Sequence, residues 1–191
     1  MNVFDFDNTI YRGESTVDFF RFCLRKKPSM VRYLPAILWQ LLRYKCGIVP
    51  AETLITRAER VLRCFLQEIR DIDALVSEFC DRNEHKIKDQ FRAMLNEDVL
   101  ILSGSCEILL AEICRRLGVQ KYLGTRVDLD ACRVEFLCYH ENKVKAFREN
   151  YPTETIDRFY SDSIHDLPIA QLADRAFRVR GDRVTPWIET A

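Results

Sequence analysis

The sequence lacks an excess of either charge, since 29 Lys and Arg residues balance 29 Asp and Glu residues. Without an overall basic field, the chain offers little to hold a polyanion, and we expect no nucleic-acid partner. It also lacks the composition of a disordered chain, because 48% of its residues are hydrophobic and 30% are charged. Its 191 residues can form one sizeable core, or a core domain with a smaller insert.

The sequence contains eight cysteines but lacks a C-x-x-C pair, so it gives no sign of a zinc or redox site. The cysteines are scattered, mostly within apolar patterns: Cys23, Cys46, Cys64, Cys80, Cys106, Cys114, Cys132 and Cys138. We interpret them as reduced core residues. No signal peptide precedes the first expected strand at Val3, so we expect the reducing environment of the cytoplasm.

The sequence also lacks an apolar run of the roughly 18 residues expected of a membrane span. The apolar segment Leu34–Leu42 is well short of that length, and Arg32, Arg43 and Lys45 bracket it. Two interpretations remain open: a helix buried in a helical module, or an apolar face that rests on a membrane surface or receives an apolar substrate. We favour burial, because buried and amphipathic helices are far commoner than interfacial ones.

Two carboxylates interrupt and follow the first expected strand. The segment Val3–Phe6 is rich in strand formers, and a turn signal follows at Asn8–Thr9. Ligands of parallel α/β sheets bind beyond the carboxyl ends of the strands, so this placement would present Asp5 and Asp7 to a substrate. An isolated Asp-x-Asp triplet is more often a solvated edge, so the interpretation depends on the later motifs.

From Arg12 to about Glu97 the pattern indicates helix after helix. The first runs from Glu14 and stops at Lys27–Pro28. Later helices are expected over Ser29–Cys46, after Pro50, through Leu75–Cys80 and through Ile87–Leu95. Such a block, inserted directly after the first strand, predicts a separate helical module that covers the strand ends.

A second strand with a small-residue turn follows this block. Val99–Leu102 is a continuous apolar run, typical of a strand buried on both faces of a parallel sheet. The turn leads into a helix over Cys106–Leu117, for which Ser105 is the expected N-cap. Ser103 would project its hydroxyl beyond the strand, and Gly104 would permit close backbone approach, so the turn suits a phosphate oxygen.

A lysine at a helix start is the next notable feature. After a strand and hairpin expected between Tyr122 and Tyr139, Lys143 lies in the first turn of a helix. The helix dipole disfavours a cation there, and a bound anion would remove that objection. Spacing alone does not distinguish Lys143 from Lys145.

A second acidic cluster follows the strand that ends at Phe159–Tyr160. Asp162 and Asp166 lie just beyond this strand, and Pro168 begins a short helix. Carboxylates from two strands suit a hard divalent cation, and Mg²⁺ typically binds one or two carboxylates, waters and phosphate oxygens. A final short strand is expected over Ala176–Val179.

Taken in order, Asp5-x-Asp7-x-Thr9, Ser103-Gly104, Lys143 and Asp162-Ser-x-x-Asp166 resemble the four motifs of the haloacid dehalogenase superfamily. Within it the chain is most similar to the phosphoserine phosphatase-like branch. The resemblance implies an α/β fold, a Rossmann-like doubly wound parallel sheet formed by residues 1–12 and 97–191, with an all-helical cap inserted at residues 13–96. The family pattern has glycine where this chain has Asn8 and Ser161.

The resemblance also implies an Mg²⁺-dependent phosphatase. Asp5 would attack phosphorus and form an aspartyl-phosphate, and Asp7 would act as general acid and then general base. Asp5, the backbone carbonyl of Asp7 and Asp162 would bind the metal, with Asp166 one step further out.

The same resemblance assigns the phosphate contacts. Ser103, Gly104 and Lys143 would hold the non-bridging oxygens, and Thr9 would support the site with its hydroxyl.

The substrate is left open by these motifs. Phosphoserine phosphatases use a Glu at the place of Glu14 to meet the substrate amino group, and Arg57, Arg60 and Arg63 are candidates for their carboxylate-binding Arg. We expect a small phosphomonoester. A phosphatidylglycerophosphate-type lipid phosphatase is the alternative within the family, and a non-catalytic interaction protein is a disfavoured alternative, because every motif residue is present.

Overall fold

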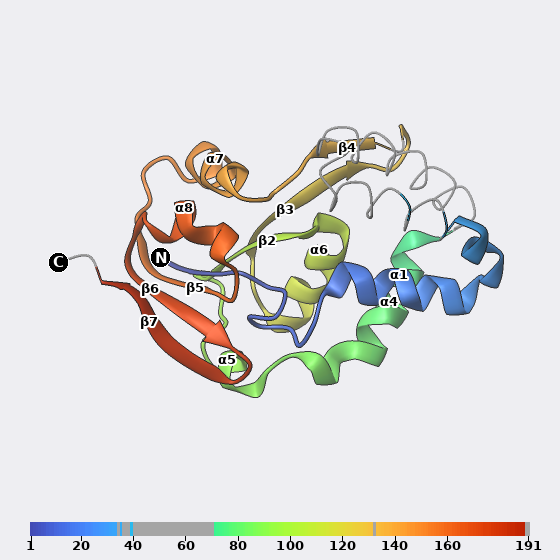
Figure 1. The fold of residues 1–191 in the computed structure, drawn as a ribbon, viewed down its shortest axis with the longest axis horizontal. Coiled ribbons are helices and arrows are strands. Elements are labelled where there is room, and N and C mark those ends of the chain that lie inside the picture. The colour runs from blue at the N-terminus through green and yellow to red at the C-terminus, as the bar shows by residue number, and fades with distance from the viewer. Residues whose placement is uncertain (34, 36–38, 40–70, 132, 190–191) are drawn as a thin grey trace.

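A seven-stranded sheet forms the centre of the protein, with the strand order β4-β3-β2-β1-β5-β6-β7 (Figure 1). The computed structural model describes residues 1–33, 35, 39, 71–131 and 133–189. The strands are β1 (Asn2–Phe4), β2 (Leu100–Cys106), β3 (Lys121–Asp128), β4 (Arg133–Phe136), β5 (Ile156–Ser161), β6 (Ala173–Arg180) and β7 (Arg183–Glu189).

The first strand lies in the middle of the sheet. β1 pairs in parallel with β2 and β5, with Val3 opposite Leu100 on one side and Phe159 on the other. β3 and β6 extend the parallel sheet outward. The chain crosses over between neighbouring strands, which places the carboxyl ends of β1, β2 and β5 at one edge. The expected α/β class with a Rossmann-like, mainly parallel sheet is therefore confirmed.

The two outer strands are antiparallel, and one of them was not expected from the sequence. In place of a single short strand over Ala176–Val179, β6 and β7 form a hairpin whose turn contains Gly181 at φ +60°. Pro186 cannot donate a hydrogen bond to a ladder, and it is tolerated here because β7 is an edge strand of the described sheet.

Nine described helices and 3₁₀-helices accompany the sheet: α1 (Ser15–Lys26), η1 (Pro28–Tyr33), α4 (Ile72–Asn83), η2 (Glu84–Lys86), α5 (Asp89–Arg92), α6 (Glu107–Leu117), α7 (Glu141–Asn150), η3 (Ile164–Asp166) and α8 (Leu167–Ala170). α1 and α4 pack together through Phe22 and Phe79, whose ring centroids are 5.8 Å apart, and extend away from the sheet (Figure 1). Within the part of the chain that the structure describes, no helix is both long and apolar enough to cross a membrane.

The helical block partly matches its sequence prediction. The helix expected from Glu14 is present as α1, and the one through Leu75–Cys80 as α4. The helix expected over Ile87–Leu95 is only the single turn α5, because Ile87 pairs instead with Tyr11 in a β-bridge. The segment after Pro28 begins as a 3₁₀-helix. Most of the apolar segment 34–42, the helix after Pro50 and the candidate Arg57, Arg60 and Arg63 lie outside the described residues.

Both faces of the sheet are buried, which explains the continuous apolar runs of its strands. One apolar cluster includes Phe4, Phe79 and Leu110, and a second includes Val3 and Phe147 on the other face. Of the eight cysteines, the five described ones are free thiols, and four of these are buried: Cys23, Cys80, Cys114 and Cys138. The interpretation as reduced residues is confirmed for these five, although Cys106 is only partly buried.

Asp18 of α1 ties the helical block to the segments that join it to the sheet. Its Oδ2 accepts hydrogen bonds from the Tyr11 hydroxyl at 3.0 Å and from Lys86 Nζ at 2.7 Å. Burial opposes ionisation of this carboxyl, but the hydrogen bonds from Lys86 and Tyr11 outweigh it and lower the pKa of Asp18. These contacts stabilise the point where α1 leaves the sheet.

The chain leaves and re-enters the sheet region side by side. The Arg12 N–H donates to the Lys86 carbonyl at 2.9 Å, and the Lys88 N–H donates to the Ile10 carbonyl at 2.9 Å. The residues between Arg12 and Lys86 thus begin and end at one place.

Candidate active site

Asp5 directly follows the last residue of β1, at the point where hydrogen bonding between β1 and β5 ends. Its N–H donates to the Tyr160 carbonyl at 2.8 Å, which fixes the backbone, and the residue is buried at 5% exposure. Ser103 of β2 and Asp162 after β5 belong to the two strands that flank β1. The crossovers therefore bring the first, second and fourth motifs to one sheet edge, as the sequence predicted.

Lys143 joins two of the acidic residues. Its Nζ lies 2.8 Å from Asp5 Oδ1 and 2.8 Å from Asp166 Oδ2, and the side chain is 3% exposed. Lys145, in contrast, is exposed and pairs with Glu149 of its own helix. The structure thus distinguishes Lys143 from Lys145, which spacing alone could not. The two partners of Lys143 are carboxylates rather than a phosphate.

Asp166 is further held by Ser161, the residue that replaces a glycine of the family pattern. The Ser161 hydroxyl donates to Asp166 Oδ2 at 2.7 Å and accepts from the Ser163 N–H at 3.0 Å. One oxygen of Asp166 therefore receives both the Lys143 ammonium and this hydroxyl. The serine adds a hydrogen bond that a glycine could not supply.

The site holds more negative than positive charge. Burial raises the pKa of Asp5, and the carboxylates of Asp166 and Asp7 add to the rise, against the opposing Lys143. Burial also raises the pKa of Asp162, again with a contribution from Asp166. Lys143 stays protonated despite its burial, because Asp5 and Asp166 raise its pKa. Two carboxylates contact the Lys143 ammonium, and the charges of Asp7 and Asp162 lie close enough to act on this cluster, so a further cation would relieve their repulsion.

Asp7 is held by both of its oxygens. Oδ1 accepts from the Ser15 N–H at 2.7 Å, and Oδ2 accepts from the Ser105 hydroxyl at 2.6 Å. The Ser15 and Ser105 hydroxyls lie 2.6 Å apart and share a hydrogen bond. Asp7 is therefore fixed between the first residue of α1 and the end of β2.

The expectation that Ser105 caps the following helix is wrong. β2 continues to Cys106, which is the N-cap of α6 and makes no side-chain capping bond. The strand register shifts between Leu102 and Cys106, and the side chain of Ser105 makes its hydrogen bonds with Asp7 and Ser15. Sequence reasoning missed Ser15 and Ser105 as site residues, and only the adjacency of Ser105 to Ser103-Gly104 hinted at the second.

Thr9 connects the two acidic motifs. Its hydroxyl donates to Asp5 Oδ2 at 3.3 Å and accepts from the Asp162 N–H at 3.0 Å. Ser103 is fully buried, and its Oγ accepts from the Ser105 N–H at 3.1 Å. A Cβ on Gly104 would lie 3.6 Å from the Cys138 carbonyl, an ordinary contact, so local crowding does not require glycine there.

Asn8 and Glu14 form the rim of the site. Asn8 has φ +55°, a left-handed conformation that asparagine tolerates better than most residues, which explains how it replaces glycine. Its Nδ2 donates to Glu14 Oε1 at 2.6 Å. Partial desolvation raises the pKa of the Glu14 carboxyl, and the charges of Asp7 and Asp162 add to the rise. Glu14 therefore interacts electrostatically with the acidic cluster from the surface.

The donor set fits a magnesium ion. The available ligands are carboxylate and carbonyl oxygens, which a hard cation prefers. No three carboxylate, imidazole or thiol side chains among the described residues are placed to hold an ion by themselves. Mg²⁺ commonly takes one or two carboxylates and completes its shell with carbonyl, water and substrate oxygens. The raised pKa values of Asp5 and Asp162 mark the two carboxylates that a cation would stabilise most directly.

Comparison with known proteins agrees with these motifs. The model of the haloacid dehalogenase-like hydrolase family matches residues 3–171. A probable phosphatase of Mycobacterium tuberculosis is 35% identical over 99 residues, which cover 47% of this chain and only 34% of the relative's length.

Two solved structures are similar in fold. A protein of unknown function from Bordetella pertussis Tohama I is 21% identical, with a TM-score of 0.74. The match covers 92% of this chain and 87% of the Bordetella chain. A phosphoserine phosphohydrolase-like protein from Francisella tularensis is 17% identical with a TM-score of 0.55, covering 92% and 86%.

Proposed function

Because the chain belongs to the haloacid dehalogenase-like hydrolases, we propose that it is a phosphatase that hydrolyses small phosphomonoesters through an aspartyl-phosphate on Asp5. The observation that carries this proposal is the contact between Lys143 and two carboxylates, Asp5 and Asp166, at the carboxyl edge of the sheet. A carboxylate nucleophile must be ionised to attack, and the buried Lys143 ammonium favours that form of Asp5. Burial and the neighbouring carboxylates outweigh the lysine and raise the pKa of Asp5 to about 8, so a bound cation would be needed to ionise Asp5 fully at neutral pH.

The chemistry proceeds in two displacements. An Asp5 oxygen attacks phosphorus, a new P–O bond forms, and the ester P–O bond breaks while Asp7 gives its proton to the leaving alkoxide. Asp7 then takes a proton from a water whose oxygen attacks the same phosphorus. The bond between phosphorus and the Asp5 oxygen breaks, which releases inorganic phosphate and restores both carboxyl groups.

The remaining motif residues hold the phosphoryl group. Lys143 has a third N–H beyond the two that contact Asp5 and Asp166, and Ser103 offers a buried hydroxyl within the neighbouring strand β2. With the Gly104 backbone, these groups would contact the non-bridging oxygens.

Asp5, the Asp7 carbonyl and Asp162 would bind Mg²⁺, which when present neutralises phosphoryl charge and orients the phosphoryl group. Asp166 would stay outside the ligand shell. Its Oδ2 already accepts from Lys143 and Ser161, so it is less free to coordinate than Asp162.

We assign residues 1–12 and 97–191 to the catalytic core and residues 13–96 to a helical cap. The support is the backbone pairing of Arg12 with Lys86, which brings the start of the insert beside a segment of its last part. Glu14, at the start of the insert, lies on the rim and is our candidate for contact with the leaving group. A phosphoserine-like substrate would offer its ammonium group to this carboxylate.

The test is turnover of p-nitrophenyl phosphate with and without Mg²⁺, by wild type and by Asp5→Asn. We expect metal-dependent turnover that the variant lacks, because a carboxamide is a poor nucleophile. No turnover by the wild type at any metal concentration would favour the non-catalytic alternative. A panel with phosphoserine, sugar phosphates and phosphatidylglycerophosphate in detergent then tests the substrate class, and preference for the lipid by orders of magnitude would contradict a small-molecule substrate.

A further inference from the structure

A cavity of about 390 Å³ adjoins the acidic site on the side of Asp162. Its walls come from four separate segments: the loop after β1, the segment that returns from the helical block, the residue that follows β5, and the end of β6 with the turn to β7. Three cationic side chains, Arg12, Lys88 and Arg180, line it, and Asp162 is the one carboxylate among its described lining residues. Its size lies within the range of small-molecule sites.

Lys88 gives the cavity a buried positive charge. The residue is 2% exposed, and its Nζ donates to the Asn8 carbonyl at 2.6 Å and to the Gly181 carbonyl at 2.7 Å. Neutral carbonyls orient the ammonium but do not cancel its charge, and no carboxylate among the described residues lies within ion-pair distance of it. A third N–H is left for a ligand in the cavity.

The two arginines are available to an anion. Arg12 Nη2 lies 2.9 Å from Asp182 Oδ1, but the two side chains are 51% and 61% exposed. An ion pair between two such exposed side chains contributes little, so an anionic ligand can replace Asp182 easily. Arg180 is exposed at the end of β6, and guanidinium groups match carboxylate and phosphate oxygens with paired hydrogen bonds.

We propose that this cavity is an anion subsite that holds a second negatively charged group, a carboxylate or a phosphate, on the same substrate whose phosphomonoester is cleaved at Asp5. This inference rests on the proposed function. Asp162 belongs both to the cavity wall and to the candidate metal ligands, so the subsite directly adjoins the reaction centre. A metal on Asp162 would offset the one negative charge of the lining and leave the three cations to select an anion.

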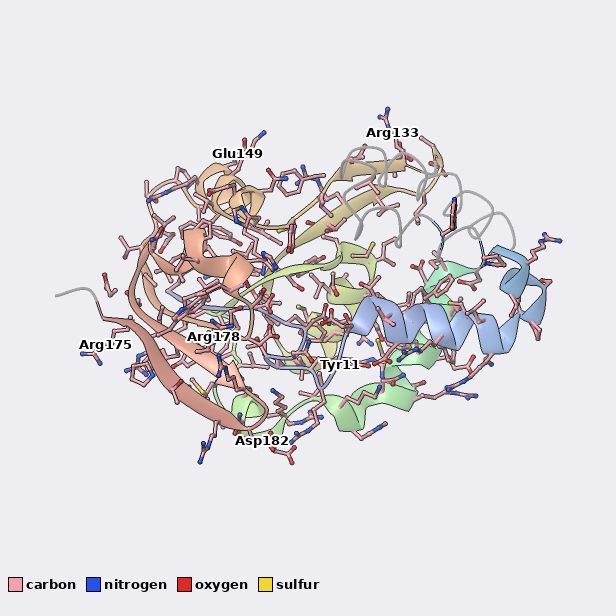
Figure 2. All side chains as sticks on the ribbon, viewed as in Figure 1. Tyr11, Arg133, Glu149, Arg175, Arg178 and Asp182 are labelled. Carbon is pink, nitrogen blue, oxygen red and sulfur yellow. The ribbon has the colours of Figure 1, made fainter. Side chains whose placement is uncertain are left out.

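Asp182 then acts as an internal competitor for Arg12. Figure 2 shows Asp182 at the tip of the β6–β7 hairpin and Arg175 at the opposite end of it. Arg175 is exposed on the same strand as Arg180 but does not line the cavity, so it provides a matched control.

The experiment uses two substrate pairs that differ in one anionic group. O-phosphoserine differs from phosphoethanolamine by a carboxylate, and fructose 1,6-bisphosphate differs from fructose 6-phosphate by a phosphate. For each pair we measure the ratio of the KM of the doubly anionic member to that of its partner, in wild type, Arg180→Gln, Arg175→Gln and Asp182→Asn. The pair with the larger response identifies whether a carboxylate or a phosphate is preferred.

We expect Arg180→Gln to raise this ratio about tenfold for the preferred pair, as the loss of one charge-assisted hydrogen bond would. Asp182→Asn should lower the ratio, and Arg175→Gln should leave it unchanged. Equal ratios in all four proteins would overturn the subsite while leaving the phosphatase intact. If the wild-type protein hydrolyses neither member of either pair and does not hydrolyse p-nitrophenyl phosphate, the proposed function is overturned, and the subsite with it.

Discussion

The hydroxyl of Ser105 provides a sharp test of the role of Asp7. It is 1% exposed, donates to Asp7 Oδ2 at 2.6 Å, and lies 2.6 Å from the Ser15 hydroxyl and 3.2 Å from that of Thr16. Ser105→Ala removes this hydroxyl and leaves Asp7 with the Ser15 N–H alone. The carboxyl group would keep its place in the chain but lose the contact that fixes its orientation.

The size of the effect follows from the kind of bond that is lost. A hydrogen bond to a charged group contributes about 1.5–3 kcal/mol. Since each 1.4 kcal/mol corresponds to about a factor of ten in rate, kcat for an alkyl phosphate should fall about ten- to a hundredfold. The loss should be smaller for the phosphorylation step with p-nitrophenyl phosphate, because that leaving group departs without a proton. Dephosphorylation still needs Asp7 as a base and should become slow.

The assay is rapid mixing of the Ser105→Ala protein with p-nitrophenyl phosphate. We expect a burst of nitrophenolate, close to one equivalent per enzyme, followed by slow turnover. Thr16→Val is the matched control, since it removes only the longer contact to the Ser105 hydroxyl. Melting temperatures of both variants separate a loss of orientation from a loss of folded protein. If Ser105→Ala kept the wild-type kcat on phosphoserine, the proposed role of Ser105 in orienting Asp7 would be refuted. An equal fall in kcat on alkyl and aryl esters, without a burst, would refute it as well.

Three further predictions follow from the site and its surroundings. Asp162→Asn should abolish metal-dependent turnover, whereas Asp166→Asn should weaken metal affinity about ten- to a hundredfold, as measured by Mg²⁺ titration of turnover. A loss of turnover in both variants that excess Mg²⁺ does not restore would make Asp166 a direct ligand. Acid-quenched wild type should carry a hydroxylamine-labile phosphate on the peptide that contains Asp5, detected by mass spectrometry, and a phosphate elsewhere would contradict the mechanism. Asp18→Asn should reduce the free energy of unfolding by about 1–3 kcal/mol at neutral pH. Because the folded-state pKa of Asp18 is lowered, its contribution is present above the unfolded pKa and is lost as pH falls through the folded pKa, so urea denaturation of variant and wild type should converge in acid.

The residues that the sequence predicted best are those fixed by short, local patterns. Asp5 follows strand formers and precedes a turn, so its place at a strand end could be derived without any knowledge of distant segments. Lys143 needed the fold, because only the packing of α7 against the sheet selects it over Lys145.

The parts that could not be predicted depend on pairing between distant segments. Ser105 has the composition of an N-cap, and its contact with Asp7 exists only because β2 lies beside β1 and continues through Cys106. β7 contains a proline and has no strong strand pattern, and it is ordered by its pairing with β6. Neither feature has a signal within a short window of sequence.

The backbone pairing of Arg12 with Lys86 has a consequence for how the chain tolerates change. The two residues are joined by a hydrogen bond of 2.9 Å, so the entropy of bringing the ends of the intervening segment together is already compensated by contacts of the core. Loop closure depends only weakly on length, at about 0.6 kcal/mol for each doubling. Changes in length between α1 and α4 should therefore alter the stability of the sheet little, whereas α1 and α4 themselves should tolerate less change, because Phe22 and Phe79 belong to the same apolar cluster as Phe4. Substrate choice is then free to diverge through the segment between these two helices while the reaction chemistry stays constant.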